Sequence, residues 1–307
     1  MTTRRTFLRN TVTTTVGILT ASAVARAAGT STDPLNPFKG ADIFDRILAK
    51  ALAGNWQSLP IGQAMGKIAM ELKGTPYVGF TLELSKDHEI CSVNLAGLDC
   101  VTFFEDTLDF ARMLKTGGRT PQDLLAQVTL TRYRDGQIGD FTSRLHYTTD
   151  WFANNEKKGV VHILAPDLPG SEPFTQKVGI MSEQPNNYRQ LKAHPELVAK
   201  IHEFENQINA HNAESMKYIP LSDLAAVQSL LQTGDIVGVC TTEPGIDIAH
   251  TGLVYQDASG TPHFMDASSS KKNMKVTLES EPISQDFRWS HKLTGAMFAR
   301  PLEPKSS

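Results

Sequence analysis

The sequence NLAGLDCVTF, residues 94–103, contains the signal for the start of a helix, with a cysteine where that helix begins. Asp99 is among the residue types that best cap a helix N-terminus, so Cys100 is expected in the first helical turn. Apolar residues then recur at helical spacing through Leu108 and Ala111. We therefore expect a helix over 99–114 that buries one apolar face and carries a thiol at its start.

A thiol in this position is a candidate nucleophile. The first turn of a helix has free backbone N–H groups and the positive end of the helix dipole. Both favour the thiolate, which is the reactive form, and the same N–H groups can stabilise a developing oxyanion. The alternative for Cys100 is a buried structural cysteine, which is the more common environment of a free thiol.

Elements on either side of this helix indicate the fold class. Helical spacing predicts further helices over 42–52, 61–72, 121–128, 194–212 and 221–231. Strands are expected over 77–84, 89–95 and 129–134, and in the last hundred residues over 235–241, 250–255, 262–266 and 296–300. N-terminal helices followed by a mostly antiparallel C-terminal sheet make an α+β arrangement.

Two of the C-terminal strands carry a candidate base and its partner. His250 begins the strand 250–255, and Asp266 ends the strand that returns after the turn at 257–260. An antiparallel pair of this length would bring Asp266 close to His250. A carboxylate there would fix the tautomer of the imidazole and favour its charged form. Alternatively, Asp266 only ends a strand and His250 is a surface residue.

Composition excludes several classes of protein. The chain has 307 residues, of which 40% are hydrophobic and 21% charged, so it can bury a large core and is neither disordered nor fibrous. A formal net charge of −3 predicts no nucleic-acid partner. Three cysteines are too few for a disulfide scaffold and lack zinc-finger spacing. No apolar run of the mature region is long enough to span a bilayer.

The N-terminus has the features of an export signal over residues 1–27. Arg4 and Arg5 precede Phe-Leu, an uncharged apolar stretch covers 11–24, and Ala25-Arg26-Ala27 supplies small residues for cleavage. The paired arginines resemble a twin-arginine signal. We expect the precursor to use the twin-arginine export machinery and the mature protein to be periplasmic. Residues 28–40 are predicted to be a flexible arm.

Several motifs, in order, resemble those of a known group of enzymes. They are GTPYVG (74–79), GLDCVTFFE (97–105), RYRDGQIGDFTSRLHY (132–147), GDIVGV (234–239), HTGLVY (250–255) and HFMDASS (263–269). This set resembles the NlpC-type branch of papain-like cell-wall hydrolases, and in particular its N-acetylmuramoyl-L-alanine amidase-like members. The resemblance extends from about residue 61 to 300.

The resemblance implies a papain-like α+β fold, with a single catalytic domain over 41–307 and an insertion around 115–215. It implies Cys100 as the catalytic cysteine and His250 as the catalytic histidine. The third polar residue, often His in relatives, is Asp266 in this chain, and a carboxylate can also orient imidazole. Tyr77 matches a tyrosine that commonly flanks such sites, where its hydroxyl can help the oxyanion.

Further residues are candidates for substrate binding. Besides Tyr77, they are Asn94, Asp99, Arg144, His146, Tyr147 and Asp247. Arg144 could hold a carboxylate in bidentate fashion, and the neighbouring aromatic rings could pack against a sugar or a peptide. For these residues a structural ion pair and core packing are the alternative. Asp99 could meet a cationic group, although capping alone would explain it.

We expect no metal and no cofactor, because the sequence has no H-E-x-x-H and no short spacing of zinc ligands. The predicted activity is a cysteine amidase acting on peptidoglycan or muropeptides, with the bond between N-acetylmuramic acid and L-alanine favoured by the resemblance. The alternatives are cleavage between γ-D-glutamate and meso-diaminopimelate, a non-catalytic muropeptide-binding protein, and an acyltransferase.

Overall fold

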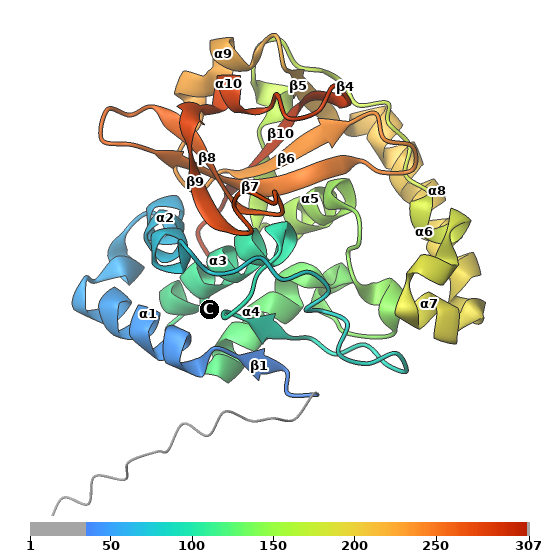
Figure 1. The fold of residues 1–307 in the computed structure, drawn as a ribbon, viewed down its shortest axis with the longest axis horizontal. Helices are drawn as coiled ribbons and strands as arrows, with labels where there is room; N and C mark the ends of the chain where they lie inside the picture. The colour runs from blue at the N-terminus through green and yellow to red at the C-terminus, as the bar shows by residue number, and fades with distance from the viewer. Residues whose placement is uncertain (1–34, 306–307) are drawn as a thin grey trace, which may run out of the picture. The chain divides into compact units, whose positions relative to one another are not determined.

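The computed structural model describes residues 35–305, and its N-terminal half is mainly helical. The larger helices of this half are α1 (Ala41–Ala53), α2 (Ile61–Leu72), α3 (Cys100–Lys115), α4 (Pro121–Arg132) and α5 (Thr148–Lys157). The helices predicted around the cysteine are therefore confirmed, with α3 beginning at Cys100. Figure 1 shows α3 between the other N-terminal helices and the sheet.

The C-terminal half forms most of one sheet. Its strands are β3 (Val161–Ile163), β4 (Glu172–Pro173), β5 (Lys217–Pro220), β6 (Ile236–Thr241), β7 (Ile248–Gln256), β8 (Pro262–Ser268), β9 (Lys275–Pro282) and β10 (Leu293–Pro301). They are ordered β4-β5-β10-β6-β7-β8-β9, with β3 also paired to β10. Every pairing in this sheet is antiparallel. The structure thus confirms an α+β fold with an antiparallel sheet.

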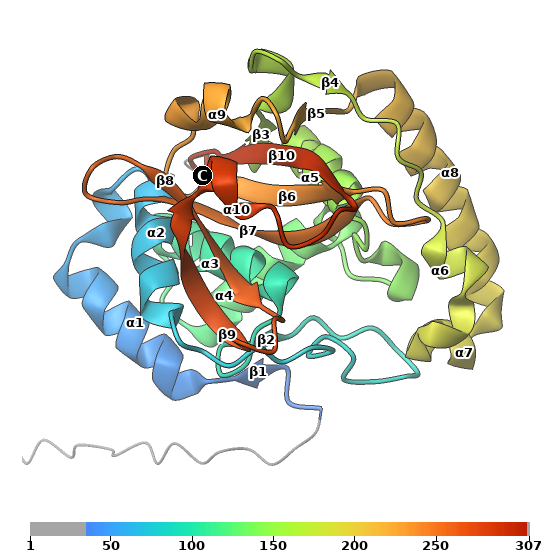
Figure 2. The same cartoon turned by 45° about the horizontal axis from the view of Figure 1, so that its top comes forward.

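Helices lie over both faces of the sheet (Figures 1 and 2), and the two faces have separate hydrophobic cores. On one face, α3 packs against β7 and β8, and Phe103 and Phe104 are fully buried in the larger hydrophobic cluster. On the other face, α9 (Leu224–Val227) and α10 (Ile283–Asp286) cover Phe264 and Phe298. The packing of α3 on β7 brings the start of the helix to the beginning of that strand.

Helix α3 is buried more completely than its sequence predicts. All residues from Thr102 to Leu114 are buried, including the carboxylates of Glu105, Asp106 and Asp109. Arg132 of α4 compensates two of them, with nitrogen–oxygen distances of 2.8 Å to Glu105 and 3.4 Å to Asp106. A helix with one apolar face was expected, but paired charges allow the polar faces to be buried as well.

The predicted insertion around 115–215 contains α4, α5 and three further helices. These are α6 (Ile180–Glu183), α7 (Arg189–Ala193) and α8 (Val198–Ser215), which lie together at the right of Figure 1. They enclose a hydrophobic cluster of their own around Phe141, Met181 and Ile208. Short 3-10 helices occupy many of the connections: η1 (Trp56–Ser58), η2 (Arg134–Gly136), η3 (Phe141–Ser143), η4 (Ala165–Asp167), η5 (Pro185–Asn187), η6 (Pro195–Leu197) and η7 (Gln228–Leu230).

Several predicted strands are wrong. The segment 77–84 is a loop with one bridge from Tyr77 to Leu98, and only β2 (Val93–Asn94) forms within 89–95. The segment 129–134 mostly continues α4. Strand β9 was missed because it lies at the sheet edge, where its outward residues are polar. Within the predicted arm over 28–40, residues 38–39 form β1 (Phe38–Lys39), which pairs with β2, and residues 28–34 lie outside the described part of the chain. Residues 1–27 lie outside the described part of the chain.

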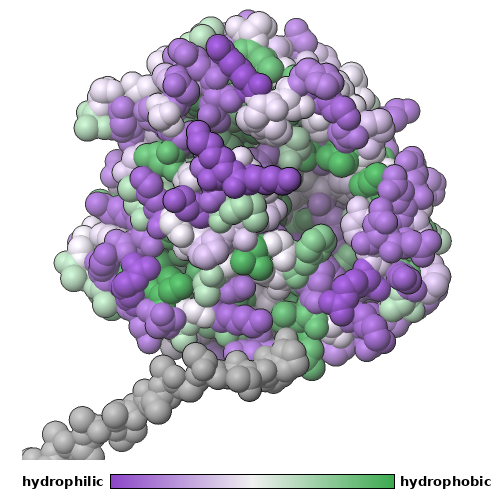
Figure 3. Space-filling view, viewed as in Figure 1, coloured by the Kyte–Doolittle hydropathy of each residue, from purple (hydrophilic) through white to green (hydrophobic). Residues whose placement is uncertain are grey.

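The surface is mostly hydrophilic on the face seen in Figure 3, with hydrophobic residues scattered between polar ones. In the region 35–305, Phe80 and Trp289 are the most exposed of the large apolar side chains, at 86% and 54%. No helix in that region combines the length and the apolar content needed to cross a bilayer.

Candidate active site

Cys100 lies at the first position of α3, as its sequence predicts. Asp99 caps the helix, since its carboxylate accepts from the Thr102 backbone N–H at 2.8 Å. In return, the Asp99 N–H donates to the Thr102 hydroxyl at 2.9 Å, which completes a capping box. The Cys100 side chain is partly exposed. The thiol therefore stands at a fixed helix start, near backbone N–H groups that have no partner within the helix.

His250 and Asp266 meet across two neighbouring strands. β7 and β8 pair in antiparallel register, and His250 Nε2 lies 2.6 Å from a carboxylate oxygen of Asp266. The other oxygen of Asp266 accepts from the Thr277 hydroxyl of β9 at 3.2 Å. The predicted proximity of His250 and Asp266 is confirmed, and the carboxylate is held on both sides. Because Nε2 faces Asp266, Nδ1 of His250 remains for other partners.

The electrostatic environment of His250 favours the imidazolium. Burial opposes the positive charge, but the charge of Cys100 and hydrogen bonds to Asp266 and Cys100 outweigh it. Together they raise the pKa of His250 to about 10. The environment therefore favours the imidazolium form of His250, with Cys100 within hydrogen-bond reach. Such a pair can supply both a nucleophile and the proton for a leaving group.

Tyr77 lies beside this pair, in the loop that precedes Asn94. Its backbone bridges to Leu98, two residues before the cysteine. Burial and the nearby charges of Cys100 and Asp99 raise the pKa of Tyr77 to about 12. The phenol therefore keeps its proton, and its O–H is available as a donor close to the sulfur.

Asn94 and Asp99 have local structural tasks in the segment that leads to Cys100. The Asn94 side chain accepts from the Ala96 N–H at 3.2 Å, and Asp99 caps α3. Gly97 allows the loop of Tyr77 to pack closely, because a Cβ at this position would lie 2.6 Å from a methyl group of Val78. Asn94 and Asp99 therefore both stabilise the backbone of the segment that leads to Cys100.

Arg144 is committed to a buried ion pair. Its Nε and Nη2 each donate to Glu89 at 2.7 Å, and Nη1 donates to Glu83 at 2.8 Å. The residue is 7% exposed. Arg144 therefore forms a structural ion pair, which was the alternative to binding a substrate carboxylate. Its bidentate pair of N–H groups is occupied by Glu89.

Three further predicted substrate residues also have internal partners. His146 bonds to the Phe141 carbonyl at 2.7 Å, and burial lowers its pKa to about 3. The Tyr147 hydroxyl donates to Glu205 at 2.6 Å. Asp247 accepts from the backbone and hydroxyl of Thr149 at 2.8 and 2.9 Å, which caps the first turn of α5. Within residues 35–305, no hydrogen bond or ion pair joins these three residues or Arg144 to Cys100, His250 or Asp266, and their contact with a substrate stays a prediction.

A cavity of about 380 Å³ adjoins His250 and Asp266. Trp289 stands on its wall, 54% exposed, with its ring centroid 6.1 Å from that of His250 in an edge-to-face contact. Asp286 and Glu279 also line it. Sequence reasoning missed these residues, although a tryptophan in the polar segment DFRWSHK, residues 286–292, was a signal that could have been followed.

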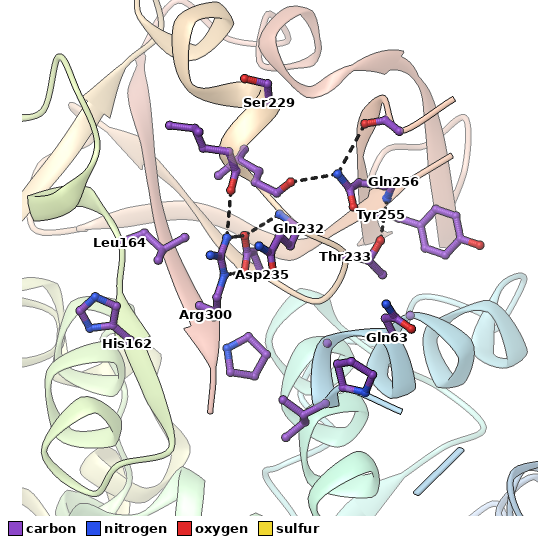
Figure 4. Close-up of a pocket in the computed structure, with 18 of the residues that line it drawn as sticks. Gln63, His162, Leu164, Ser229, Gln232, Thr233, Asp235, Tyr255, Gln256 and Arg300 are labelled. Carbon is purple, nitrogen blue, oxygen red and sulfur yellow. Dashed lines mark hydrogen bonds and ion pairs between the residues drawn. The ribbon is translucent and has the colours of Figure 1, made fainter. Parts of the chain in front are cut away.

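A larger cavity, of about 1390 Å³, lies at the opposite end of β7. Figure 4 shows Gln63, Gln232 and Gln256 among its lining residues, together with the Arg300–Asp235 ion pair. No cysteine lines this cavity, and its His162 bonds to Glu156 and Asp167. It contains no nucleophile with a neighbouring base, so we place the candidate chemistry at Cys100.

The described residues do not suggest a metal centre. Between residues 35 and 305, no three His, Cys, Asp or Glu side chains converge in a way that could hold an ion.

Comparison with known proteins identifies the family of the chain. A family model described as N-acetylmuramoyl-L-alanine amidase-like matches residues 67–285, which is more than half of the chain and includes Cys100, His250 and Asp266. The chain belongs to this family. The amidase-like part of the sequence resemblance is thereby confirmed. This places the chain among amidase-like peptidoglycan hydrolases.

Solved structures show the same fold in other members and relatives. An N-acetylmuramoyl-L-alanine amidase from Bacteroides uniformis is 28% identical, with a TM-score of 0.69 over 79% of this chain and 99% of its own. A Bacteroides fragilis protein described as a proposed xylanase is 30% identical, with a TM-score of 0.66 over 76% and 98%. A Legionella pneumophila protein, 20% identical with a TM-score of 0.62, shares the fold over 87% and 98%. No curated protein shows significant similarity to the chain.

Proposed function

We propose that this protein is a cysteine amidase that hydrolyses an amide bond in peptidoglycan or muropeptides. The observation that carries the proposal is the arrangement of a helix-start cysteine beside an imidazole that is held at 2.6 Å by Asp266. Membership of the amidase-like family supports the substrate class. We also propose that the fold belongs to the papain-like group, as the motifs around Cys100 and His250 indicate.

In the proposed reaction, the Cys100 thiolate attacks the amide carbonyl carbon and forms a carbon–sulfur bond. The imidazolium of His250 gives its proton to the amide nitrogen as the carbon–nitrogen bond breaks, and the amine leaves. A water molecule then attacks the thioester and transfers a proton to His250. The carboxylic acid is released, and the thiolate and imidazolium are regenerated. Asp266 keeps the imidazole oriented and stabilises its charge throughout.

The negative charge that develops on the carbonyl oxygen needs donors. The backbone N–H groups in the first turn of α3 are available at Cys100, and Tyr77, whose pKa is raised by the charge of Cys100, keeps its hydroxyl proton; both can supply such donors. Among the predicted substrate-binding residues other than Asp99, Tyr77 is the one whose pKa is raised by the charge of Cys100.

The bond between N-acetylmuramic acid and L-alanine is the proposed point of cleavage, since the family description names it and a structural relative carries the same name. The bond between γ-D-glutamate and meso-diaminopimelate is the second candidate. Two other functions would use the same cleft: binding of muropeptides without cleavage, and acyl transfer to an acceptor other than water.

We further propose that residues 1–27 export the protein by the twin-arginine route to the periplasm, where its substrate is found. The support is Arg4 and Arg5 with the apolar stretch and small residues that follow.

Mass spectrometry of defined muropeptides after incubation with residues 28–307 tests the activity and the bond. Hydrolysis at N-acetylmuramic acid releases an intact stem peptide, hydrolysis at γ-D-glutamate releases a peptide that begins with diaminopimelate, and acyl transfer gives a conjugate. Cys100→Ala should lower turnover at least a hundredfold, on the order expected for the loss of a covalent nucleophile. Cys91→Ala is the matched control, because the Cys91 thiol bonds to Thr129, away from His250.

Two reagents separate a thiol mechanism from a metal mechanism. Iodoacetamide should abolish activity, since it alkylates the thiolate. A chelator should leave activity unchanged. Loss of activity with chelator that zinc restores, or full activity in Cys100→Ala, would refute the proposal.

A further inference from the structure

The cavity beside His250 combines residues of two sequence motifs with residues of segments that no motif marked. His250 comes from β7, Asp266 from β8 and Glu279 from β9, and α10 and the segment after it supply Asp286 and Trp289. The connection between β8 and β9 closes the remaining side with Ser269, Ser270, Lys272 and Asn273. Neither Cys100 nor Tyr77 lines it. The cavity therefore adjoins the imidazole and its partner Asp266, and the thiol is not part of its wall.

This position determines which half of a substrate the cavity faces. In acyl transfer to a thiol, the carbonyl carbon becomes bonded to sulfur, so the acyl half stays at Cys100. The departing nitrogen takes its proton from the imidazolium and must lie over His250 within hydrogen-bond reach. A cavity that begins at the imidazole and does not reach the sulfur thus lies on the side of the amine half.

The chemistry of the walls suits a peptide. The exposed ring of Trp289 offers an apolar surface against which backbone and short alkyl groups can pack. Lys272 carries a positive charge, Glu279 and Asp286 are acidic, and serine hydroxyls lie between them. Burial and the charges of Glu279 and Asp266 raise the pKa of Asp286 to about 7. Charges of both signs beside an aromatic ring match amide, carboxylate and ammonium groups.

We propose that this cavity binds the amine half of the substrate, a segment of stem peptide, and that Trp289 determines its affinity. The inference rests on the proposed function of Cys100 and His250. It holds for either candidate bond, because the departing half begins with L-alanine in one case and with diaminopimelate in the other, and is a peptide in both. The volume of about 380 Å³ lies within the range of roughly 300–1,000 Å³ typical of small-molecule pockets.

Binding of the separate halves tests the location directly. In the Cys100→Ala protein, the free tripeptide L-Ala-γ-D-Glu-meso-diaminopimelate should bind and change tryptophan fluorescence, whereas free N-acetylmuramic acid at equal concentration should not. The chain also contains Trp56 and Trp151, so the variant Trp289→Phe assigns the signal: it should abolish the fluorescence change while calorimetry still detects the peptide. Fluorescence that responds to the sugar, or a Trp289→Ala protein with unchanged peptide affinity, would overturn the inference.

Kinetics provide a second readout with matched substrates. For cleavage at N-acetylmuramic acid, one substrate is N-acetylmuramoyl-L-alanine and the other carries the full tetrapeptide, so that they share the acyl half and differ in the departing half; for cleavage at diaminopimelate, the pair is N-acetylmuramoyl-tripeptide and N-acetylmuramoyl-tetrapeptide. Trp289→Ala should raise KM for the tetrapeptide substrate about tenfold, equal to about 1.4 kcal/mol of binding, with kcat nearly unchanged. Its effect on the short substrate should stay within about twofold, given that little of that substrate reaches the ring. Trp289→Phe should restore most of the loss.

Phe80→Ala is the control, since Phe80 is exposed and aromatic but does not line the cavity. Any loss in this variant should be equal for the two substrates. If the unaltered protein cleaves both substrates and Trp289→Ala loses activity equally on both, the inference fails and the proposed function stands. If the unaltered protein cleaves neither, nor any other muropeptide, the proposed function itself fails.

Discussion

Replacing Asp266 by Asn should weaken the acid–base function of His250 without removing it. Asp266 accepts a charge-assisted hydrogen bond from the imidazolium at 2.6 Å and is itself buried. The amide keeps the shape of the carboxylate but loses its charge. It can also present its NH₂ group to Nε2, which would favour the other tautomer.

The size of the effect follows from this bond. Hydrogen bonds to charged groups contribute about 1.5–3 kcal/mol, and one pKa unit corresponds to about 1.4 kcal/mol. The pKa of His250, about 10 in the unaltered protein, should therefore fall by about one to two units. On the same scale kcat/KM should fall about 10- to 150-fold, less than in His250→Ala.

The rate of alkylation by iodoacetate, measured from pH 5 to pH 11, reports this change. This anion reacts with the thiolate and is attracted by the neighbouring imidazolium, so its rate should decrease when His250 loses its proton. That decrease should occur near pH 10 in the unaltered protein and about one to two units lower in Asp266→Asn. Thr277→Val is the matched control, because it removes a longer contact, 3.2 Å, from an uncharged donor to the other oxygen of Asp266, and the same hydroxyl lies closer to Glu279, at 2.9 Å. It should shift the decrease by less than about one unit.

An Asp266→Asn protein with an unshifted alkylation profile and full activity would show that Asp266 does not act on His250. A loss larger than that of His250→Ala would mean that the base, or its partner, has been assigned wrongly.

Three further predictions concern stability and export. Burial raises the pKa of Asp109 to about 7, so the folded state holds a proton that the unfolded state releases above about pH 4. The free energy of unfolding should therefore fall as the pH rises from about 4 to about 7, by at most about 4 kcal/mol. Thermal unfolding of Asp109→Asn, measured over the same pH range, should lack this loss. Arg144→Met should lower the free energy of unfolding by about 3–5 kcal/mol, because it leaves the buried Glu89 without its charged partner. The activity per folded molecule should stay the same, whereas a selective rise in KM would indicate that Arg144 binds the substrate. Changing Arg4 and Arg5 to Lys should retain the precursor inside cells, and normal export in cells without twin-arginine machinery would assign the general route.

The local start of α3 and the pairing of β7 with β8 were both readable in the sequence. Asp99 followed by Cys100 and Thr102 is a capping signal that acts within four residues, so it needs no tertiary context. His250 and Asp266 lie on strands joined by a short turn, which limits the possible registers. In both cases the interacting groups are close along the chain.

The meeting of Cys100 with His250, and the surroundings of both, depend on tertiary packing. The two residues are brought together only because α3 packs against β7. The same long-range packing buries Arg144 against Glu89, 55 positions away, so that Arg144 forms a structural ion pair. Its local sequence would suit substrate binding equally well. It also places Trp289 beside His250. Spacing and periodicity carry no information on such contacts, because these depend on how complete elements pack against one another.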